Sequence, residues 1–189
     1  MEQTLKEALD VLRKGGVILY PTDTVWGLGC DACNSEAVAR IFALKKRADS
    51  KSLVLLSADL DMIARYVKEI PEMALQLIEV NDAPMTLIYP QACRGALAEG
   101  TVAEDGSVGI RIPQSEFCQR LAGRLGHLLV STSANISGQP TPKCFAEIPQ
   151  EIKDAVDYIV DPSLEAQATG LASQIIKVEL DGRVKIIRA

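Results

Sequence analysis

The sequence predicts an α/β fold: a single domain, residues 1–189, with a twisted mixed sheet flanked by helices. The first observation is that segments with apolar residues at helical spacing alternate with short apolar runs, as helices alternate with buried strands. The second is the length of 189 residues, which is ordinary for one domain and includes no repeat or low-complexity linker. The third is a composition of 48% hydrophobic and 24% charged residues, typical of a protein with its own core.

Helical spacing is clearest near the N-terminus, where apolar residues on one face run from Leu5 to Leu12 and a glycine pair at 15–16 offers a stop. Ser35 and Ser115 resemble the N-caps of later helices. Further helices are predicted at residues 35–44, 59–67, 71–80, 115–124 and 145–155.

Short apolar runs that end at turn residues predict the strands. Pro21 ends the first run, and a glycine-rich connection through Gly27 and Gly29 follows it. Strands are predicted at residues 17–20, 53–56, 85–89, 108–112, 128–130 and 157–160, and in hairpin arms at 174–178 and 184–187. Asp181 and Gly182 form the turn signal of that hairpin. Residues 91–106, rich in glycine, alanine and charge, are predicted to be a loop.

Charge and hydrophobicity restrict the class of protein. The net charge of −5 argues against a surface that binds nucleic acid through phosphates alone, because such binding needs clustered lysine and arginine. No apolar segment approaches 18 residues, and the N-terminus lacks the layout of a signal peptide. We therefore expect a cytoplasmic protein that has no contact with a membrane.

The five cysteines are odd in number and scattered, which indicates reduced thiols rather than a disulfide framework. Cys30 and Cys33 form a C-x-x-C pair. A structural zinc site would need two more ligands, there is no second pair, and His127 is the only histidine. The pair is therefore interpreted as incidental, and no metal-binding residue is predicted.

Several familiar motifs are missing. The chain has neither the G-x-x-x-x-G-K-[ST] loop nor the G-x-G-x-x-G turn that bind nucleotides in other α/β proteins. It also lacks a G-x-S-x-G elbow, and a single histidine makes a hydrolytic triad improbable. His127 follows Gly126 and is interpreted as an ordinary turn residue.

Polar residues gather where predicted strands and helices end, at residues 20–29, 45–51, 107–113 and 131–138. Lys45, Arg47 and Lys51 fit either a solvated helix end or a phosphate clamp. Arg111 interrupts an apolar strand, so it either needs a buried partner or ligand or lies on a solvated face opposite its isoleucine neighbours. Residues 131–135, Ser-Thr-Ser-Ala-Asn, fit either a capped turn or a site for an anion or amino acid.

These four segments together resemble the YrdC-like family, the threonylcarbamoyl-AMP synthases. The resemblance covers the whole chain in order: Y-P-T-D-T-V at residues 20–25, K-x-R at 45–47, V-G-I-R-I-P at 108–113 and S-T-S-A-N-x-S-G at 131–138. It implies a twisted sheet with a large concave basic face. Because the chain ends at Ala189, it resembles the short single-domain form of the family.

The resemblance also implies an activity: synthesis of L-threonylcarbamoyladenylate and pyrophosphate from L-threonine, bicarbonate or CO₂, and ATP, with Mg²⁺. Threonylcarbamoyl-transfer proteins would pass the product to tRNA. The catalytic cations would be Lys45 and Arg47. The ATP-binding residues would be Arg47, Lys51, Ser107, Asn135, Lys143 and Arg188. The L-threonine-binding residues would be Thr24, Leu56, Arg111, Ser133 and Ser173.

Some positions depart from the family pattern. Ala48 and Ser52 stand where proline is usual, Asp82–Ala83 replaces Pro-Gly, and Trp26 replaces a tyrosine or phenylalanine. None of these changes removes an expected ligand group. Two other functions stay open: a non-catalytic module that binds tRNA or double-stranded RNA, and a paralogue that hydrolyses a related carbamoyl or acyl phosphate. The assembly, monomer or homodimer, is also open.

Overall fold

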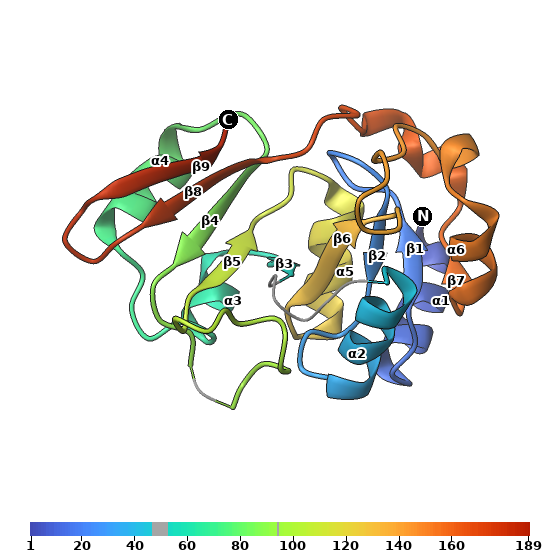
Figure 1. Ribbon diagram of the computed structural model, residues 1–189, viewed down its shortest axis with the longest axis horizontal. Coiled ribbons are helices and arrows are strands. Elements are labelled where there is room, and N and C mark those ends of the chain that lie inside the picture. Colours follow the sequence, from blue (N-terminus) through green and yellow to red (C-terminus); the bar gives the residue numbers. More distant parts are fainter. Residues whose placement is uncertain (47–52, 94) are drawn as a thin grey trace.

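The computed structural model describes residues 1–46, 53–93 and 95–189 (Figure 1). The helices and 3₁₀ turns are α1 (Glu2–Arg13), α2 (Ser35–Leu44), α3 (Leu60–Ala64), α4 (Glu72–Val80), α5 (Glu116–Leu125), η1 (Phe145–Glu147), α6 (Gln150–Ala155) and η2 (Pro162–Gln167). The strands are β1 (Ile18–Tyr20), β2 (Gly27–Gly29), β3 (Val54–Leu56), β4 (Met85–Tyr89), β5 (Val108–Arg111), β6 (Leu129–Ser133), β7 (Tyr158–Ile159), β8 (Gln174–Val178) and β9 (Val184–Arg188).

Within the described ranges, the nine strands form one sheet in the order β7-β1-β2-β6-β3-β5-β4-β8-β9. The pairs β1–β7, β3–β5 and β4–β8 are parallel, and the other neighbouring pairs are antiparallel. The predicted α/β fold with a mixed sheet is therefore confirmed. Neighbours such as β2 and β6 lie far apart in the chain, so the sheet brings distant segments together.

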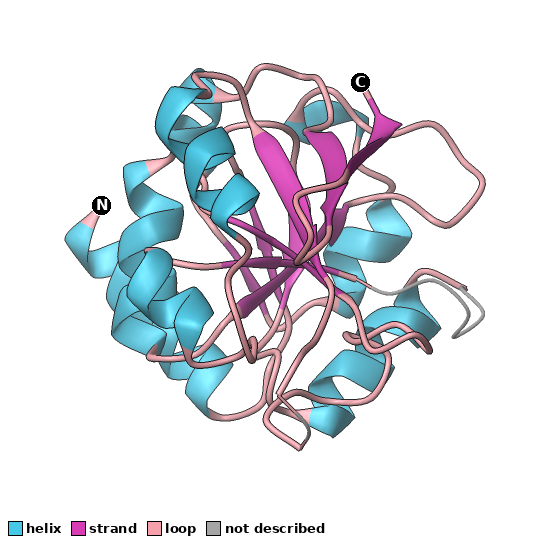
Figure 2. Cartoon of the chain, turned by 90° about the vertical axis from the view of Figure 1, so that its left-hand side faces the viewer, coloured by secondary structure: helices cyan, strands magenta, loops and turns pink. Residues whose placement is uncertain are grey.

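The sheet is covered by helices on both faces (Figure 2). Alternate residues of β1 show why: Ile18 and Tyr20 point into an apolar cluster shared with α1 and α5, whereas Leu19 points into the larger cluster on the opposite face. The same alternation separates Leu56 from Leu55 in β3. Because side chains of a strand alternate between faces, continuous apolar runs are what a sheet buried on both sides requires.

The glycine-rich connection expected after the first strand is itself a strand, β2, paired with both β1 and β6. A Cβ atom on Gly29 would lie 2.6 Å from Cε1 of Tyr20 and 3.0 Å from the carbonyl oxygen of Val130. Only glycine lets the backbone pass at this distance. Glycine indicated a loop in the sequence, whereas here it permits close packing inside the sheet.

Three other boundaries differ from the sequence interpretation. Asn34, not Ser35, caps α2: its side chain accepts a hydrogen bond from the amide of Ala37. The predicted helix at 145–155 is divided into η1 and α6, because Pro149 precedes the second segment. The strand predicted to end at Val130 continues to Ser133, so the hydroxyl-rich segment is partly a paired strand rather than only a turn.

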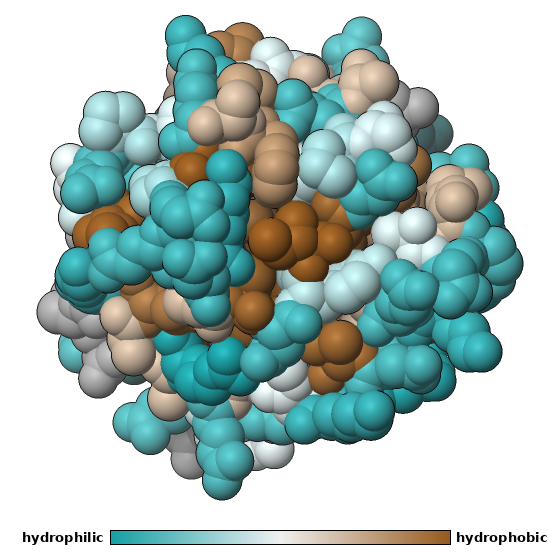
Figure 3. Space-filling view, turned by 90° about the vertical axis from the view of Figure 1, so that its right-hand side faces the viewer, coloured by the Kyte–Doolittle hydropathy of each residue, from teal (hydrophilic) through white to brown (hydrophobic). Residues whose placement is uncertain are grey.

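The surface that includes α6 and β7 is mostly hydrophilic, with a hydrophobic area near its centre (Figure 3). Throughout the described chain, every helix is too short or too polar to reach from one side of a lipid bilayer to the other.

Candidate functional site

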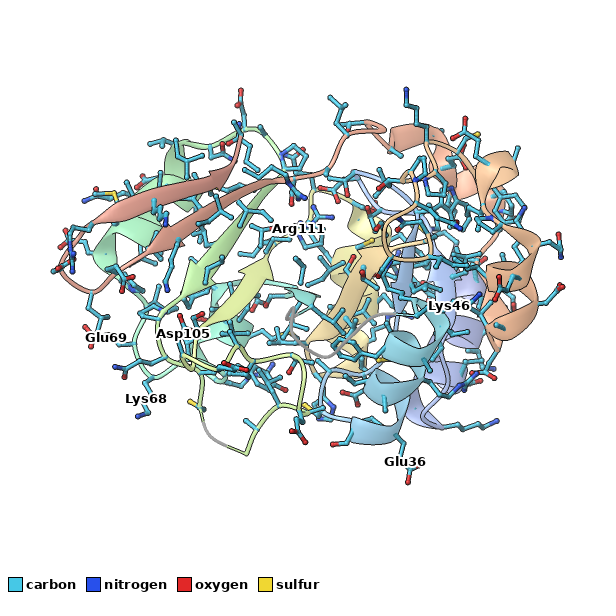
Figure 4. The ribbon with its side chains drawn as sticks, viewed as in Figure 1. Glu36, Lys46, Lys68, Glu69, Asp105 and Arg111 are labelled. Carbon is cyan, nitrogen blue, oxygen red and sulfur yellow. The ribbon has the colours of Figure 1, made fainter. Side chains whose placement is uncertain are left out.

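A cavity of about 1610 Å³, called here the central hollow, opens between the β2–β6 part of the sheet and strands β5, β8 and β9. Its wall is rich in hydroxyl groups, which come from Thr24, Ser35, Ser131, Thr132, Ser133, Thr141 and Ser173. Of the residues that the structure describes, the charged ones in this lining are Glu99, Glu104, Asp105, Arg111 and Arg188. Figure 4 shows Arg111 near the middle of the molecule, whereas Glu36 and Lys68 point outward.

Arg111 is held by Asp23. Its Nη1 lies 2.8 Å from each carboxylate oxygen of Asp23, and only 3% of the arginine side chain and 6% of the aspartate side chain are exposed. The backbone amide of Gln114 donates a further hydrogen bond to Asp23. The interpretation of Arg111 as a residue on a solvated face is therefore wrong. Burial of the guanidinium is possible because a carboxylate compensates its charge.

The second arm of the guanidinium contacts Thr24: Nη2 donates to its hydroxyl at 3.1 Å. Thr22 donates its own hydroxyl proton to the carbonyl of Val25, so the 2.8 Å contact between the Thr22 and Thr24 hydroxyls uses the proton of Thr24. Thr24 Oγ1 thus retains acceptor capacity only. At the edge of the hollow, this oxygen can accept a hydrogen bond from a ligand hydroxyl or ammonium group.

Ser173 and Arg188 form another part of the wall. The Ser173 hydroxyl lies 2.8 Å from that of Thr86, and its carbonyl accepts bonds from Nε and Nη2 of Arg188 at 2.9 and 2.7 Å. Among the residues described, no side chain or carbonyl pairs with Nη1 of Arg188. An anion in the hollow can therefore accept from that nitrogen.

Lys45 supports the segment that follows β6. Its Nζ donates to the carbonyls of Ser133 at 2.6 Å and of Asn135 at 2.8 Å, and lies 3.2 Å from Oδ1 of Asn135. Asn135 is also bonded to the Ser133 hydroxyl and to the carbonyl of Gln139. With 3% exposure, Lys45 acts here as a buried positioning residue for the 133–135 segment.

A loop across the hollow contains Asp105. Its carboxylate accepts the hydroxyl of Ser107 at 2.5 Å and Nζ of Lys177 at 2.9 Å. The hydrogen bond from Ser107, assisted by Lys177, lowers the pKa of Asp105 to about 2, so it is ionised at neutral pH. With Glu99 and Glu104 it makes this side of the described wall acidic.

Trp26 fixes the segment that borders the hollow near Thr141. Its indole Nε1 donates to Glu165, which also accepts the amide of Phe145 at 2.7 Å. The rings of Trp26 and Phe145 are 5.0 Å apart in a tilted arrangement. Trp26 stands where the family usually has tyrosine or phenylalanine, and its indole has a hydrogen-bond partner here in Glu165.

The structure brings together many of the residues expected from the sequence. Thr24, Arg111, Ser133, Ser173 and Arg188 line the hollow. Lys45, Leu56, Ser107 and Asn135 are buried and are not among its lining residues, and Leu56 pairs with Arg111 across β3 and β5.

The remaining expected residues are not found in the lining as the structure describes it. Lys143 is exposed and is not part of the lining. Arg47 and Lys51 fall outside the described residues.

Sequence reasoning missed Asp23, and the signal was present: an arginine inside an apolar strand needs a compensating acid, and Asp23 follows a buried strand. It also missed the acidic residues Glu99, Glu104 and Asp105, because no short motif singles out acidic residues in a loop.

Comparison with known proteins places the chain in a family. A model described as "Telomere recombination", which represents Sua5, YciO and YrdC proteins, matches residues 10–189. The chain belongs to this family. A protein named threonylcarbamoyl-AMP synthase from Idiomarina loihiensis is 37% identical over 160 residues, which cover 83% of this chain and 85% of that protein. The protein of the same name from Pseudoalteromonas translucida is 31% identical over 185 residues, 97% of each chain.

Solved structures of the family share the fold. The chain matches P. abyssi Sua5 complexed with L-threonine with a TM-score of 0.83 and 27% identity, over 94% of this chain and 52% of that one. The chain thus spans about half the length of that Sua5 protein. E. coli YciO matches with a TM-score of 0.79 and 25% identity, over 100% of this chain and 89% of that one. The expected family and fold are confirmed.

Proposed function

We propose that the protein is a nucleotidyltransferase that makes L-threonylcarbamoyladenylate and pyrophosphate from ATP, L-threonine and bicarbonate or CO₂. The observation that carries the proposal is the arrangement of Arg111 and Thr24: a guanidinium fixed by Asp23 and a hydroxyl acceptor meet at the wall of a hollow rich in hydroxyl groups. Relatives at 31% and 37% identity named threonylcarbamoyl-AMP synthase support the same reaction.

The reaction needs no histidine base. Threonine's amine and bicarbonate give a carbamate and water, and the carbamate is already an anion. One carbamate oxygen forms a bond to the α-phosphorus of ATP while the bond from that phosphorus to the pyrophosphate oxygen breaks. Charge repulsion opposes this approach, so cations and fixed donors that stabilise the leaving pyrophosphate lower the barrier. Arg188 and the expected cations Arg47 and Lys51 would serve that role. Lys45 would hold the 133–135 segment in place.

Selection of threonine would come from the hydroxyl-rich wall. Arg111 would hold the threonine carboxylate, and Thr24, Ser133 and Ser173 would hydrogen-bond the hydroxyl or amine. A site built for a hydroxyl group discriminates strongly against an analogue without it, because its own polar groups then lose their partners. We therefore expect valine to be a poor substrate.

Mg²⁺ would enter with ATP. Hard cations of this kind prefer oxygen ligands and are commonly shared between carboxylates and phosphates. Carboxylates of Glu99, Glu104 and Asp105 line the hollow, so the donor set fits. Asp105 already bonds Ser107 and Lys177, which makes the two glutamates the better candidates to hold the ion. The metal would neutralise charge on the triphosphate.

We also propose that the adenylate supplies N6-threonylcarbamoyladenosine of tRNA in the cytoplasm, through separate threonylcarbamoyl-transfer proteins. The acidic part of the described wall favours a small-molecule site over direct binding of RNA, which needs a basic surface.

The test is pyrophosphate release by the purified protein with ATP, Mg²⁺, L-threonine and bicarbonate, compared with reactions that omit one component. Mass spectrometry with carbon-13 bicarbonate then identifies the product. The proposal requires labelled threonylcarbamoyladenylate that depends on all of the substrates. Release of AMP or phosphate without any need for threonine would instead indicate a hydrolase.

A further inference from the structure

Asp31, Cys33 and His127 place three different metal-ligating atoms at one site near the surface. One carboxylate oxygen, the sulfur and one imidazole nitrogen all lie within 4.8 Å of one another. Asp31 and Cys33 are partly buried, and His127 is exposed. None of the three belongs to the lining of the central hollow.

The backbone brings these residues together from two distant segments. Asp31 forms an antiparallel bridge with Leu129, and the amide of Ala32 donates to the carbonyl of Leu128 at 3.0 Å. Gly126, with a φ of 80°, ends α5 in a left-handed conformation immediately before His127. Both segments are thus tied at residues adjacent to the three side chains, so the site is largely organised before any ligand binds.

Hydrogen bonds from neighbouring groups orient the side chains of Asp31 and Cys33 within the cluster. Oδ1 of Asp31 accepts the amide of Cys33 at 2.8 Å, while its other oxygen, Oδ2, lies 2.8 Å from Nδ1 of His127. The hydroxyl of Tyr66 lies 3.6 Å from Sγ of Cys33. Partners that orient the ligands from outside, as Tyr66 and the Cys33 amide do here, are a regular feature of metal sites.

Cys30 and Cys33, the C-x-x-C pair, do not form the candidate metal site together. Cys30 is fully buried in the apolar core, whereas Cys33 faces His127 and Asp31. The sequence interpretation discounted zinc because only one histidine and no second cysteine pair were available. The fold supplies Asp31 and His127 as further ligands, because the bridge between Asp31 and Leu129 brings the two segments together beside Cys33.

We propose that Asp31, Cys33 and His127 bind one zinc ion. Sulfur, nitrogen and oxygen ligands together suit zinc, whereas Mg²⁺ and Ca²⁺ select oxygen alone. On binding, the Cys33 thiol releases its proton, and the thiolate and carboxylate together balance the two positive charges of the metal. Nδ1 of His127 exchanges its contact with Asp31 for the metal. The exposure of His127 leaves a fourth, tetrahedral position to water.

The zinc site is separate from the proposed reaction. None of its three ligands lines the hollow. Asp31 bridges to Leu129 at the start of β6, and the lining residue Ser131 lies two residues later, which corresponds to about 7 Å at the rise of an extended strand. The ion would tie the start of β6 to the residues before α2. It would therefore stabilise the fold without contacting the substrates.

The test uses the full chain freed of metal with a chelator and then titrated with Co²⁺, with Zn²⁺ as competitor. We expect one equivalent of Co²⁺ with visible bands of tetrahedral intensity and a thiolate charge-transfer band. Cys33→Ala should abolish the charge-transfer band and weaken zinc binding by more than about 100-fold, which exceeds the loss typical for an outer-shell partner. His127→Gln should weaken binding to a similar extent, and its exposed position makes misfolding improbable.

Cys144→Ala is the matched control, because Cys144 is also a partly buried thiol but lies far from the cluster in the sequence. It should bind metal as the unchanged protein does. The proposal is overturned if the unchanged protein binds no Zn²⁺ at micromolar concentration, or if the charge-transfer band survives in Cys33→Ala. Equal binding by His127→Gln and the unchanged protein would overturn it too. Zinc should also raise the Tm of the unchanged protein but not that of Cys33→Ala.

Discussion

The guanidinium of Arg111 and the carboxylate of Asp23 form a buried ion pair in which Nη1 lies 2.8 Å from both carboxylate oxygens. The pair joins β5 to the segment after β1, and it leaves Nη2 of the arginine to donate to Thr24 at the wall of the hollow. Asp23 therefore compensates the buried charge of Arg111 and also orients the guanidinium at the wall of the central hollow.

Asp23→Ala should lower the free energy of unfolding by about 3–5 kcal/mol, because it leaves Arg111 buried without a compensating charge. Chemical denaturation measures this loss. A double-mutant cycle with Arg111→Met should give a coupling energy of at least about 1 kcal/mol, as expected for residues in direct contact. Additive effects of the two changes would show that the pair is not coupled.

Arg111→Ala should raise the threonine concentration needed for half-maximal pyrophosphate release far more than the ATP concentration. Thr24→Val keeps the ion pair and removes only one hydroxyl. It should weaken threonine binding by roughly tenfold, equivalent to about 1.4 kcal/mol for one lost hydrogen bond. ATP binding is the internal control. A larger effect on ATP than on threonine would mean that the two pockets are interchanged.

Lys45→Met should destabilise the protein by about 3 kcal/mol, because the carbonyls of Ser133 and Asn135 lose a charged donor in a buried position. Lys46→Met is the control. That neighbouring side chain is 61% exposed and pairs with Glu151 at the surface, so its loss should change stability by less than about 1 kcal/mol. Lower turnover in Lys45→Met at unchanged stability would instead assign Lys45 a direct catalytic contact.

Asp105 should contribute a pH-dependent increment to stability. Its carboxyl pKa is lowered from 3.8 to about 2 in the folded protein, so the increment is present above pH 3.8 and is lost as the pH falls toward 2. Because the side chain is 55% exposed, the increment should be below about 1 kcal/mol. Unfolding of Asp105→Asn at pH 7 and near pH 2, compared with Glu104→Gln, measures it. An equal loss at both pH values would contradict the assignment.

Sequence patterns predicted most elements because apolar spacing is a local property: the face from Leu5 to Leu12 and the run at β4 became buried as expected. Gly27–Gly29 was misinterpreted because glycine favours loops locally, while the packing of Gly29 against Tyr20 is decided by a distant strand. The same limit applies to the site. Arg111 was recognised as unusual, but its exposure depended on Asp23, which lies 88 residues away in the chain.

The cluster of Asp31, Cys33 and His127 shows this limit again. Spacing along the chain paired Cys33 with Cys30, while pairing of strands brought it beside a histidine 94 residues later. Short sequence motifs therefore identify a binding or catalytic site well only when its residues lie in one segment of the chain.

A crystal structure of the protein with L-threonine and a non-hydrolysable ATP analogue would show whether one hollow holds both substrates. We expect the threonine carboxylate on Arg111, its hydroxyl or amine on Thr24, and the triphosphate within reach of Arg188 in the same hollow. Threonine bound away from Arg111, or a nucleotide bound outside the hollow, would contradict this expectation.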